Sequence, residues 1–462
     1  MQFIKRFARN VKISLSPSFV GKGPTKRDCK IIAVALLLGF LFCPLKLEGL
    51  ESVSFKASQN PFYYLNDKFD QPVLPGREQE VRADRARGRF FLPWTEEVFR
   101  HSKEDLLWPF KAYLPGRVYD EAGTLRPKGW FEELYDKANV GAFGSVNAPG
   151  VTLAEADLRL FPTCEPAFLS PDLPGEGYPF DYGQVSHVNA GEPIRISHFS
   201  ADSLWAYVET SFAAGWIDVG KIAYVNKEAI KKCLQMPMAV AVKDNKTASE
   251  DGRILFNVKV GALFPLNKEL LYELEVLVPT GKDKKGFAMF DCVRLPKETV
   301  KRWPVEFTQW NAATLIKEMI GESYGWGGLF GKRDCSATTR DFFLPFGVWL
   351  PRNSRAQAES GSFISLDGLT APQKEKLIIE RGTPFASLLY KPGHIMLYVG
   401  TYRGKPVVFH NLWGIKTYVK GKEGRYVIGR SVLSTLDIGN GFPDIRSEDL
   451  LINNVTGLTN LL

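Results

Sequence analysis

A block of short β-rich runs between about Ser145 and Leu295 constrains the fold more than any other feature of this sequence. Within it, PIRISHFSADSLWAYVET and AAGWIDVGKIAYV alternate apolar and polar residues around polar turns, a pattern typical of a small β-barrel. Further β-rich runs begin near Leu234, namely MAVAVKDN, ILFNVKVGALFPL, LYELEVLVP and FAMFDCVRL. The pattern predicts two β modules in succession, over residues 146–232 and 233–300.

Helical patterns lie on both sides of these β modules. WTEEVFRHSKEDLLWPF and GWFEELYDKAN each carry an apolar stripe at helical spacing, and they predict a helical domain over residues 51–145. A further helix, FTQWNAATLIKEMIGES, opens a C-terminal region over residues 301–462 in which helices and strands are mixed. A chain of 462 residues is expected to form several domains, because single cores stop growing at roughly 250 to 300 residues. The sequence therefore predicts a multidomain α+β protein.

The first 50 residues read as a basic leader with an apolar core. Residues 1–30 contain eight lysines and arginines against one aspartate, and Ile31–Cys43 is an uninterrupted apolar run. This run has the length of a signal-peptide core and is shorter than the roughly 20 residues that a membrane-spanning helix needs. We expect an exported protein of the periplasm or cell envelope. It would contact the membrane only through this leader, and only if the leader is not cleaved.

Charge and cysteine spacing argue against several classes of function. The net charge of +8 lies almost entirely in the leader, so no nucleic-acid partner is expected. The cysteines beyond the leader lie far apart without a C-x-x-C pair, which argues against a metal site; they are Cys164, Cys233, Cys292 and Cys335. In a phosphate-binding loop a serine or threonine follows Gly-Lys, and here Arg333 stands at that position. No cofactor is expected.

The segment GKRDCSATTRDFF, residues 331–343, places a cysteine at the predicted start of a helix. Asp334 is a favoured N-cap residue, and Pro345 is expected to end the helix. Cys335 would then be the first helical residue, where unpaired amides and the positive end of the helix dipole lower the pKa of a thiol. The segment alone fits a reactive thiol and a buried structural cysteine about equally well.

Two histidines flank a predicted hairpin, HIMLYVG-TYRGK-PVVFH, that begins at His394 and ends at His410. If the loop is centred on Tyr402, the two histidines stand directly opposite each other, and a three-residue loop leaves them as diagonal neighbours on one face. A two-residue turn at Arg403-Gly404 sends them to opposite faces instead. In the first two registers one imidazole can act as base to a thiol while the other orients it.

Three segments of the C-terminal region resemble the NlpC-type papain-like cysteine peptidases of bacterial cell walls. They are YGWGGLFGKRDCS (324–336), LPRNSRAQ (350–357) and KPGHIMLYVG (391–400), in the order found in the family. Upstream, SHFSADSLWAYVETSFAAGWIDVGKIAYV is similar to the bacterial SH3-like modules that precede some of these peptidases. The resemblance implies a helical N-terminal domain, two SH3-like β-barrels and a papain-like peptidase domain at the end of the chain.

The resemblance also implies an activity and a set of catalytic residues. It implies an endopeptidase that cuts the bond between γ-D-glutamyl and an L-diamino acid in peptidoglycan peptides, its expected partners. By analogy Cys335 is the nucleophile, His394 the base and His410 the polar third member. Tyr324 occupies the position of a tyrosine beside the oxyanion site.

Other residues of the same motifs are candidates for substrate binding by the same analogy: Asp334, Ser336 and Ser354. Some relatives have an aspartate where this chain has Asn353, and there the acid helps to hold the free amine of the substrate. Recognition of that amine is therefore left open here.

Two other functions are compatible with the sequence. One is a catalytically silent wall-binding protein, because SH3-like modules can bind peptides without any chemistry. The presence of Cys335, His394 and His410 together argues against this alternative. The other is an amidase or acyltransferase on the same fold. The sequence also leaves open whether the diamino acid is lysine or diaminopimelate, and whether the role is wall remodelling or fragment recycling.

Overall fold

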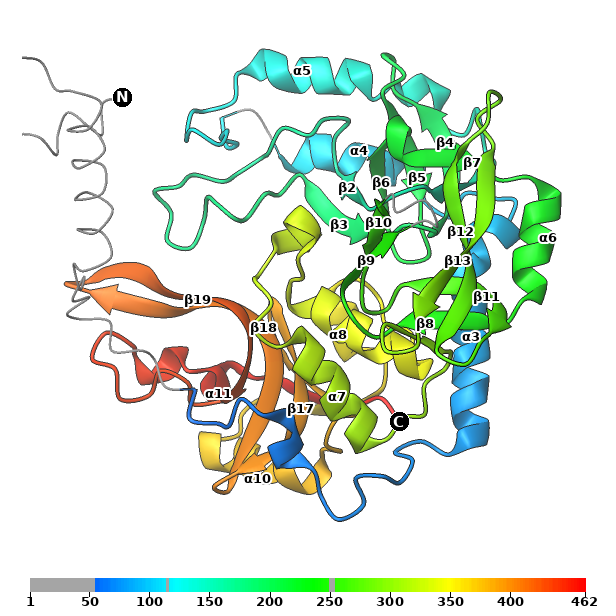
Figure 1. Ribbon diagram of the computed structural model, residues 1–462. Coiled ribbons are helices and arrows are strands. Elements are labelled where there is room, and N and C mark those ends of the chain that lie inside the picture. The colour runs from blue at the N-terminus through cyan, green and yellow to red at the C-terminus, as the bar shows by residue number, and fades with distance from the viewer. Residues whose placement is uncertain (1–54, 114–115, 249–253) are drawn as a thin grey trace, which may run out of the picture. The chain divides into compact units, whose positions relative to one another are not determined.

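The computed structural model describes residues 55–113, 116–248 and 254–462 (Figure 1). The leader expected over residues 1–50 lies outside them. Within the described part, no helix has both the length and the apolar composition needed to cross a membrane. Helices come first. Antiparallel sheets of seven and of five strands follow, and a six-stranded antiparallel sheet with helices around it ends the chain. This is the α+β organisation expected from the sequence.

Among the described residues, three α-helices precede the first sheet: α3 (Gly76–Thr95), α4 (Lys103–Ala112) and α5 (Lys128–Lys137). Two 3-10 turns, η1 (Pro61–Tyr64) and η2 (Val140–Ala142), lie at either end of this region. The sequence predicted one helix over WTEEVFRHSKEDLLWPF, but the structure divides that run between α3 and α4. The division is set by Ser102, which forms a capping box with Asp105 and so starts α4 afresh.

Seven antiparallel strands build the first β module, in the order β3-β2-β6-β5-β4-β1-β7. They are β1 (Ala148–Thr152), β2 (Ala156–Arg159), β3 (Gln184–Val188), β4 (Pro193–Phe199), β5 (Trp205–Glu209), β6 (Ala214–Asp218) and β7 (Ile222–Tyr224), with a 3-10 turn η3 (Val219–Lys221) between the last two. Trp216 is fully buried against Tyr207 and His198, so its indole belongs to the core of this module.

A helix, α6 (Lys227–Gln235), leads to the second β module, whose strands are ordered β13-β12-β11-β8-β14. Their bounds are β8 (Met238–Ala241), β11 (Leu263–Glu269), β12 (Glu273–Lys282), β13 (Ala288–Pro296) and β14 (Val300–Arg302); β9 (Asn245–Ala248) and β10 (Ile254–Val258) form a separate pair. The run ILFNVKVGALFPL was predicted as one strand. It is two, because the chain turns at Gly261, whose φ of 88° favours glycine.

The C-terminal region surrounds a six-stranded antiparallel sheet ordered β15-β20-β16-β17-β18-β19. Its strands are β15 (Ser362–Ser365), β16 (Ser387–Lys391), β17 (His394–Tyr402), β18 (Lys405–Val419), β19 (Lys422–Thr435) and β20 (Gly457–Asn460). The helices are α7 (Gln309–Met319), α8 (Cys335–Phe343), α9 (Ser354–Ala358), α10 (Ala371–Arg381) and α11 (Leu451–Asn454), with 3-10 turns η4 (Trp326–Gly331), η5 (Leu344–Phe346) and η6 (Ser447–Asp449).

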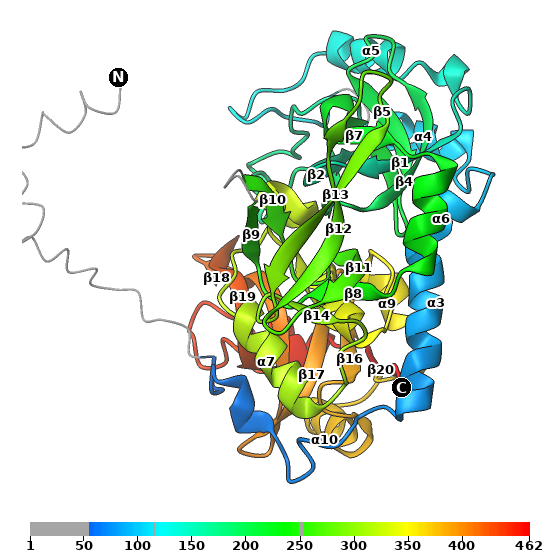
Figure 2. The ribbon, with the colours of Figure 1, turned by 45° about the vertical axis from the view of Figure 1, so that its right-hand side comes forward.

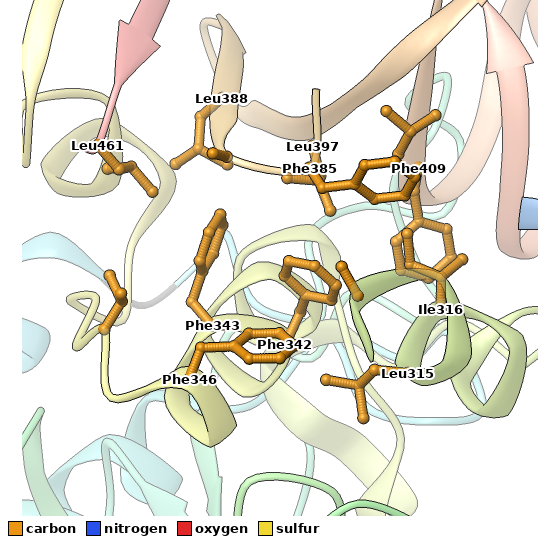
Figure 3. Close-up of a cluster of buried hydrophobic side chains, with 14 of the residues drawn as sticks. Leu315, Ile316, Phe342, Phe343, Phe346, Phe385, Leu388, Leu397, Phe409 and Leu461 are labelled. Atoms are coloured by element: carbon orange, nitrogen blue, oxygen red, sulfur yellow. The ribbon is translucent and has the colours of Figure 1, made fainter. Parts of the chain in front are cut away.

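The core of this region fixes α8 against the sheet. Phe342, Phe343 and Phe346 pack between α7 and the side chains of β16, β17 and β18, and each is at most 1% exposed (Figure 3). Burying a phenylalanine contributes roughly 1.5 to 3 kcal/mol, so these rings hold the helix firmly in place. Helix α3 lies along one side of the molecule, where it contacts β1 and β4 of the first β module and η5 of the C-terminal region (Figure 2).

Candidate active site

Cys335 is the first residue of α8, as the sequence predicted. Asp334 is the N-cap, and its Oδ1 accepts a hydrogen bond from the backbone N–H of Ala337 at 2.8 Å. The other oxygen, Oδ2, accepts from the backbone N–H of Gly327 at 3.1 Å. The carboxylate therefore holds both the helix start and the glycine-rich loop before it. Cys335 is 8% exposed, at the wall of a cleft.

The cleft has a volume of about 560 Å³. Most of the predicted site residues line it: Tyr324, Asp334, Cys335, Ser336 and Ser354. Part of its wall comes from outside the C-terminal region, with His101, Asp105 and Trp108 from the α4 region and Gln184, Tyr207 and Phe212 among the residues from the first β module. The peptidase-like region thus supplies only part of the cleft.

His394 and His410 lie behind this wall and contact each other. His394 Nε2 is 2.8 Å from His410 Nδ1, and His410 Nε2 is 3.0 Å from Ser434 Oγ. His394 is adjacent in sequence to Gly393, which lines the cleft, and to Ile395, whose backbone N–H hydrogen-bonds the Cys335 thiol. The structure thus places Cys335 against the residue that follows His394, and His394 against His410.

The hairpin of β17 and β18 combines a turn and a bulge that the sequence analysis did not predict together. The turn is the two-residue Arg403-Gly404, with Tyr402 paired to Lys405 and φ values of 49° and 76°. Both values are positive, as a type I′ turn requires. That turn alone would place the histidines on opposite faces. A β-bulge between Tyr398 and Gly400 shifts the register by one residue and returns them to the same face.

Burial determines the protonation of the three groups. Burial, followed by the charge of Asp334, raises the pKa of the Cys335 thiol to about 12, against the lowering effect of the Ile395 N–H and Arg352. Burial lowers the pKa of His410 to about 3, and burial together with His410 lowers the pKa of His394 well below its usual value. The backbone N–H of Ser336 at the helix start does lower the thiol pKa, as expected, but burial outweighs it. The resting pair is a neutral thiol and a neutral imidazole.

Tyr324 lies at the cleft with its hydroxyl protonated. Burial, followed by the nearby Cys335 and Asp334, raises its pKa well above the usual value. The ring contacts Trp413 at a centroid distance of 5.8 Å. A buried phenol that keeps its proton is a hydrogen-bond donor, which suits a position near developing negative charge.

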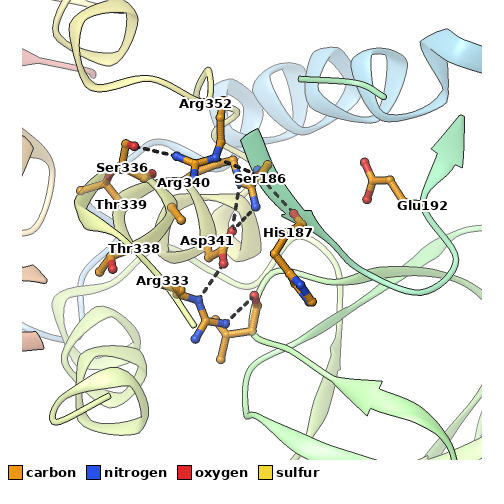
Figure 4. Close-up of polar contacts among 12 residues, drawn as sticks. Ser186, His187, Glu192, Arg333, Ser336, Thr338, Thr339, Arg340, Asp341 and Arg352 are labelled. Atoms are coloured by element: carbon orange, nitrogen blue, oxygen red, sulfur yellow. Dashed lines mark hydrogen bonds and ion pairs between the residues drawn. The ribbon is translucent and has the colours of Figure 1, made fainter. Parts of the chain in front are cut away.

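Arg352 is a site residue that the sequence analysis missed. Its guanidinium donates to Asp334 Oδ2 at 2.6 Å. It also donates to Ser336 Oγ at 2.9 Å and to Ser186 Oγ at 2.8 Å (Figure 4). Ser186 belongs to β3, so one arginine joins the first β module to the residues on both sides of Cys335. Although burial raises the pKa of Asp334, the charge of Arg352 keeps it below the usual value. In the sequence, the signal for Arg352 is its place within the family-like segment LPRNSRAQ.

Arg333 is a second missed residue, and it anchors the loop before the nucleophile. It is buried and forms ion pairs with Asp244 at 3.0 Å, Glu322 at 2.7 Å and Asp341 at 2.7 Å. Figure 4 shows its pair with Asp341, which lies on α8. Asp244 follows β8, so the second β module also reaches the nucleophile loop.

Replacing Arg352 by lysine is expected to lower kcat/KM for a peptide substrate by about 10- to 100-fold. Lysine keeps the charge but loses the planar fork that serves Asp334 and Ser336 together. Steady-state kinetics and a thermal melt of the full chain would measure the effect. Arg355→Lys is the matched control, because the Arg355 side chain is 80% exposed and its one ion pair among the described residues is with Glu359, just past the end of α9. Equal kinetics for both variants would contradict this role.

The remaining candidates have simpler surroundings. Asn353 is the N-cap of α9, and its Oδ1 accepts from the Ala356 N–H at 2.8 Å. Ser354 is the first residue of that helix. Within the described residues, no group of three or more histidine, cysteine or acidic side chains is placed to hold a metal ion.

The fold matches a solved peptidase over most of its length. An NlpC/P60 endopeptidase from Photobacterium damselae subsp. piscicida superposes with a TM-score of 0.80 at 23% identity, over 89% of this chain and 98% of that one. An NlpC/P60 family protein from Bacillus cereus aligns at 17% identity with a TM-score of 0.45, over 68% of this chain and 100% of that one. No curated protein matches the chain. The superposition on the Photobacterium endopeptidase shows that the two chains share a fold.

Family models then identify the parts of the chain. Residues 321–426 match the NlpC/P60 family, residues 166–218 match an SH3 domain of the SH3b1 type, and residues 44–143 match the N-terminal stabilising domain of NlpC/P60 proteins. Residues 321–426 thus form an NlpC/P60 domain. The chain is therefore a cysteine peptidase of the cell wall, as the sequence motifs indicated.

Proposed function

We propose that this enzyme hydrolyses the γ-D-glutamyl-L-diamino acid bond of peptidoglycan peptides with Cys335, His394 and His410. The 2.8 Å contact between His394 Nε2 and His410 Nδ1 carries the proposal. It leaves Nδ1 of His394 for the thiol. For Nδ1 to act as a base, the proton of the neutral ring must reside on Nε2 and be donated to His410. His410 then donates from its own Nε2 to Ser434 Oγ.

The chemistry follows from this chain of donors. As the sulfur attacks the γ-glutamyl carbonyl carbon, its proton passes to Nδ1 of His394, and the resulting imidazolium is stabilised by His410. The Tyr324 hydroxyl donates toward the developing oxyanion. When the C–N bond breaks, His394 returns the proton to the leaving amine and an acyl-enzyme remains. Water then attacks the thioester with His394 again as base, which releases the acid and restores the thiol.

Three supporting roles are part of the proposal. Asp334, Ser336 and Ser354 line the cleft beside the nucleophile, and we assign them to substrate binding. The domain limits are proposed as a leader (1–50), a helical domain (51–145), two β modules (146–232 and 233–300) and a peptidase domain (301–462). As an exported wall hydrolase, the enzyme would act in the periplasm or cell envelope.

Mass spectrometry of the products from defined murein peptides tests the proposed bond. With L-Ala-γ-D-Glu-L-diamino acid-D-Ala as substrate, the expected products are L-Ala-D-Glu and a dipeptide that begins with the diamino acid. Binding of the peptide without cleavage would indicate a silent wall-binding protein. Transfer of the glutamyl group to an added amine, in place of hydrolysis, would indicate an acyltransferase. Running lysine and diaminopimelate peptides in parallel identifies the preferred diamino acid.

We further propose that the cleft admits peptides with a short N-terminal side. The first β module and the α4 region line the cleft together with Cys335, so a papain-like groove is walled on that side. The expected result is that free tri- and tetrapeptides are cut much faster than the same stems attached to glycan.

Trp108→Ala is expected to reduce the preference for free peptides about tenfold. Trp108 lines the cleft and is 44% exposed, so removing its indole widens the cleft without leaving a cavity in a hydrophobic core. A tenfold change corresponds to about 1.4 kcal/mol, the order expected for one lost apolar contact surface. Trp310→Ala is the matched control, because Trp310 is 49% exposed on α7 and does not line the cleft. The ratio of the two cleavage rates is the measurement, and an unchanged ratio in Trp108→Ala would refute the wall.

A further inference from the structure

A second pocket, separate from the catalytic cleft, lies beside α3. Its volume is about 280 Å³, and it is enclosed by α3, the segment 347–350, Ser360 and Leu461. It shares no lining residue with the cleft. Yet Trp349 and Leu350 line this pocket while Arg352, two residues further on, holds Asp334 in the cleft.

Three arginines of α3 line the pocket: Arg82, Arg85 and Arg89. Their spacings of three and four residues place them on one face of the helix. None of the pocket's lining residues is acidic. The pocket therefore gathers three guanidinium groups, with Arg82 half-buried and Arg85 and Arg89 exposed to solvent.

Two of the three guanidiniums are held in place by neighbours. Arg82 is paired with Glu78 at 2.8 Å and donates to the Leu461 carbonyl at 3.0 Å. Arg89 lies over the ring of Trp349, with its guanidinium carbon 4.3 Å from the ring centroid. Donors that are already fixed lose little conformational entropy when a ligand binds.

The number of unpaired positive charges in the pocket indicates the charge of the anion that it would bind. Glu78 compensates Arg82, whereas in the described part of the chain neither Arg85 nor Arg89 forms an ion pair with a carboxylate. The pocket thus presents about two uncompensated positive charges. A single carboxylate would leave one of them unpaired, while a phosphate carries a charge of about −1.5 to −2 at pH 7 and offers three acceptor oxygens.

We propose that this pocket binds a phosphate dianion, either free or as a monoester on an organic molecule. Guanidinium and phosphate form paired, parallel hydrogen bonds, which suits Arg85 and Arg89 on either side of one anion. Nothing in this assignment depends on the peptidase reaction, and it extends the proposed function by a ligand site on the opposite side of the segment that carries Arg352.

Isothermal titration of the full chain with inorganic phosphate and with glycerol 3-phosphate tests the site. Both probes are expected to bind saturably at low salt, and the tighter of the two shows whether the anion is free or carried on an organic group. Arg85→Gln is expected to weaken binding about 10- to 100-fold, the usual effect of losing a charge-assisted contact. Arg77→Gln is the matched control: Arg77 is exposed on the same helix, lies outside the pocket lining, and its loss should leave affinity unchanged.

The proton dependence separates a dianion site from general attraction to anions. Between pH 7.5 and pH 5, phosphate becomes largely a monoanion, so its affinity should fall, while the affinity for sulfate should stay nearly constant. Absence of saturable binding, equal weakening by Arg85→Gln and Arg77→Gln, or equally tight binding of a phosphodiester would each overturn the proposal. Titration needs no catalysis, so a failure here is distinguishable from a failure of the proposed peptidase activity.

Discussion

Alanine at position 335 is expected to lower the hydrolysis of a murein tetrapeptide by at least about 10⁴-fold, with the fold retained. Loss of the nucleophile removes the only route to an acyl-enzyme, and triad knockouts in other hydrolases have effects of this size. The substitution removes one sulfur at the wall of an open cleft, so the free energy of unfolding should change by only about 1 kcal/mol. A progress curve and a thermal melt of the same preparation measure both quantities.

Cys233→Ala provides the matched control for this prediction. Cys233 is also a buried free thiol, on α6 in a different core, and burial raises its pKa to about 11. Its replacement should leave turnover unchanged although it empties a similar volume. Substantial turnover by Cys335→Ala, or an equal loss in both variants, would remove Cys335 from the role of nucleophile.

His394→Ala is expected to be almost as damaging as loss of the cysteine, with about a 10³-fold or greater fall in kcat. The thiol is neutral at rest, so attack requires a base at Nδ1 of His394, and departure of the amine requires the same proton back. His410→Gln should retain more activity than His410→Ala, since an amide can still accept from Nε2 of His394 where a methyl group cannot. Full activity of His410→Ala would show that the second histidine has no orienting role.

The same pair makes a prediction for stability against pH. The pKa of His410 is about 3 in the fold, against about 6.5 in the unfolded chain. Below pH 6.5 the unfolded chain therefore takes up a proton that the folded protein does not. The stabilisation is complete above pH 6.5 and is lost as the pH falls toward 3. Between pH 7.5 and 5, His410→Gln should lose about 2 kcal/mol less than the parent chain in urea unfolding.

The position of Cys335 at the start of a helix was predictable from the sequence because its setting is local. Asp334, Cys335 and the following helical pattern are consecutive, and an N-cap residue marks a helix start without help from the rest of the fold. The β modules were predictable for the same reason, as alternating runs between turns. The divided strand at Gly261 and the divided helix at Ser102 were missed because a cap or a turn inside an apolar run changes the element without changing the pattern.

The register of the histidine hairpin was harder to predict. Sequence analysis considered only the turn, and the true turn would have separated His394 from His410. The bulge that brings them together adjoins Gly400, whose φ is 139°. A glycine inside a strand indicates a bulge, so Gly400 is the feature of the sequence that points to this register.

The partners of Arg352 and Arg333 in the β modules could not be predicted from the sequence. Arg352 and Ser186 are 166 residues apart, and Arg333 and Asp244 are 89 apart. No periodicity pairs residues at such separations, so only the folded chain shows that both β modules reach the nucleophile. The raised pKa of Cys335 has the same origin, because its burial comes from tertiary packing and outweighs the local effect of the helix start.

The bridge from Ser186 through Arg352 to Asp334 has a consequence for how such an enzyme can diversify. A module that only captured substrate could be exchanged for another by recombination without disturbing the chemistry. Here β3 supplies an acceptor for the same guanidinium that balances the charge beside the thiol. Exchange of the first β module would therefore alter the electrostatics of the nucleophile together with ligand preference. Grafting the catalytic region onto a foreign partner would require a new acceptor for Arg352, so these units are inherited most readily as a set.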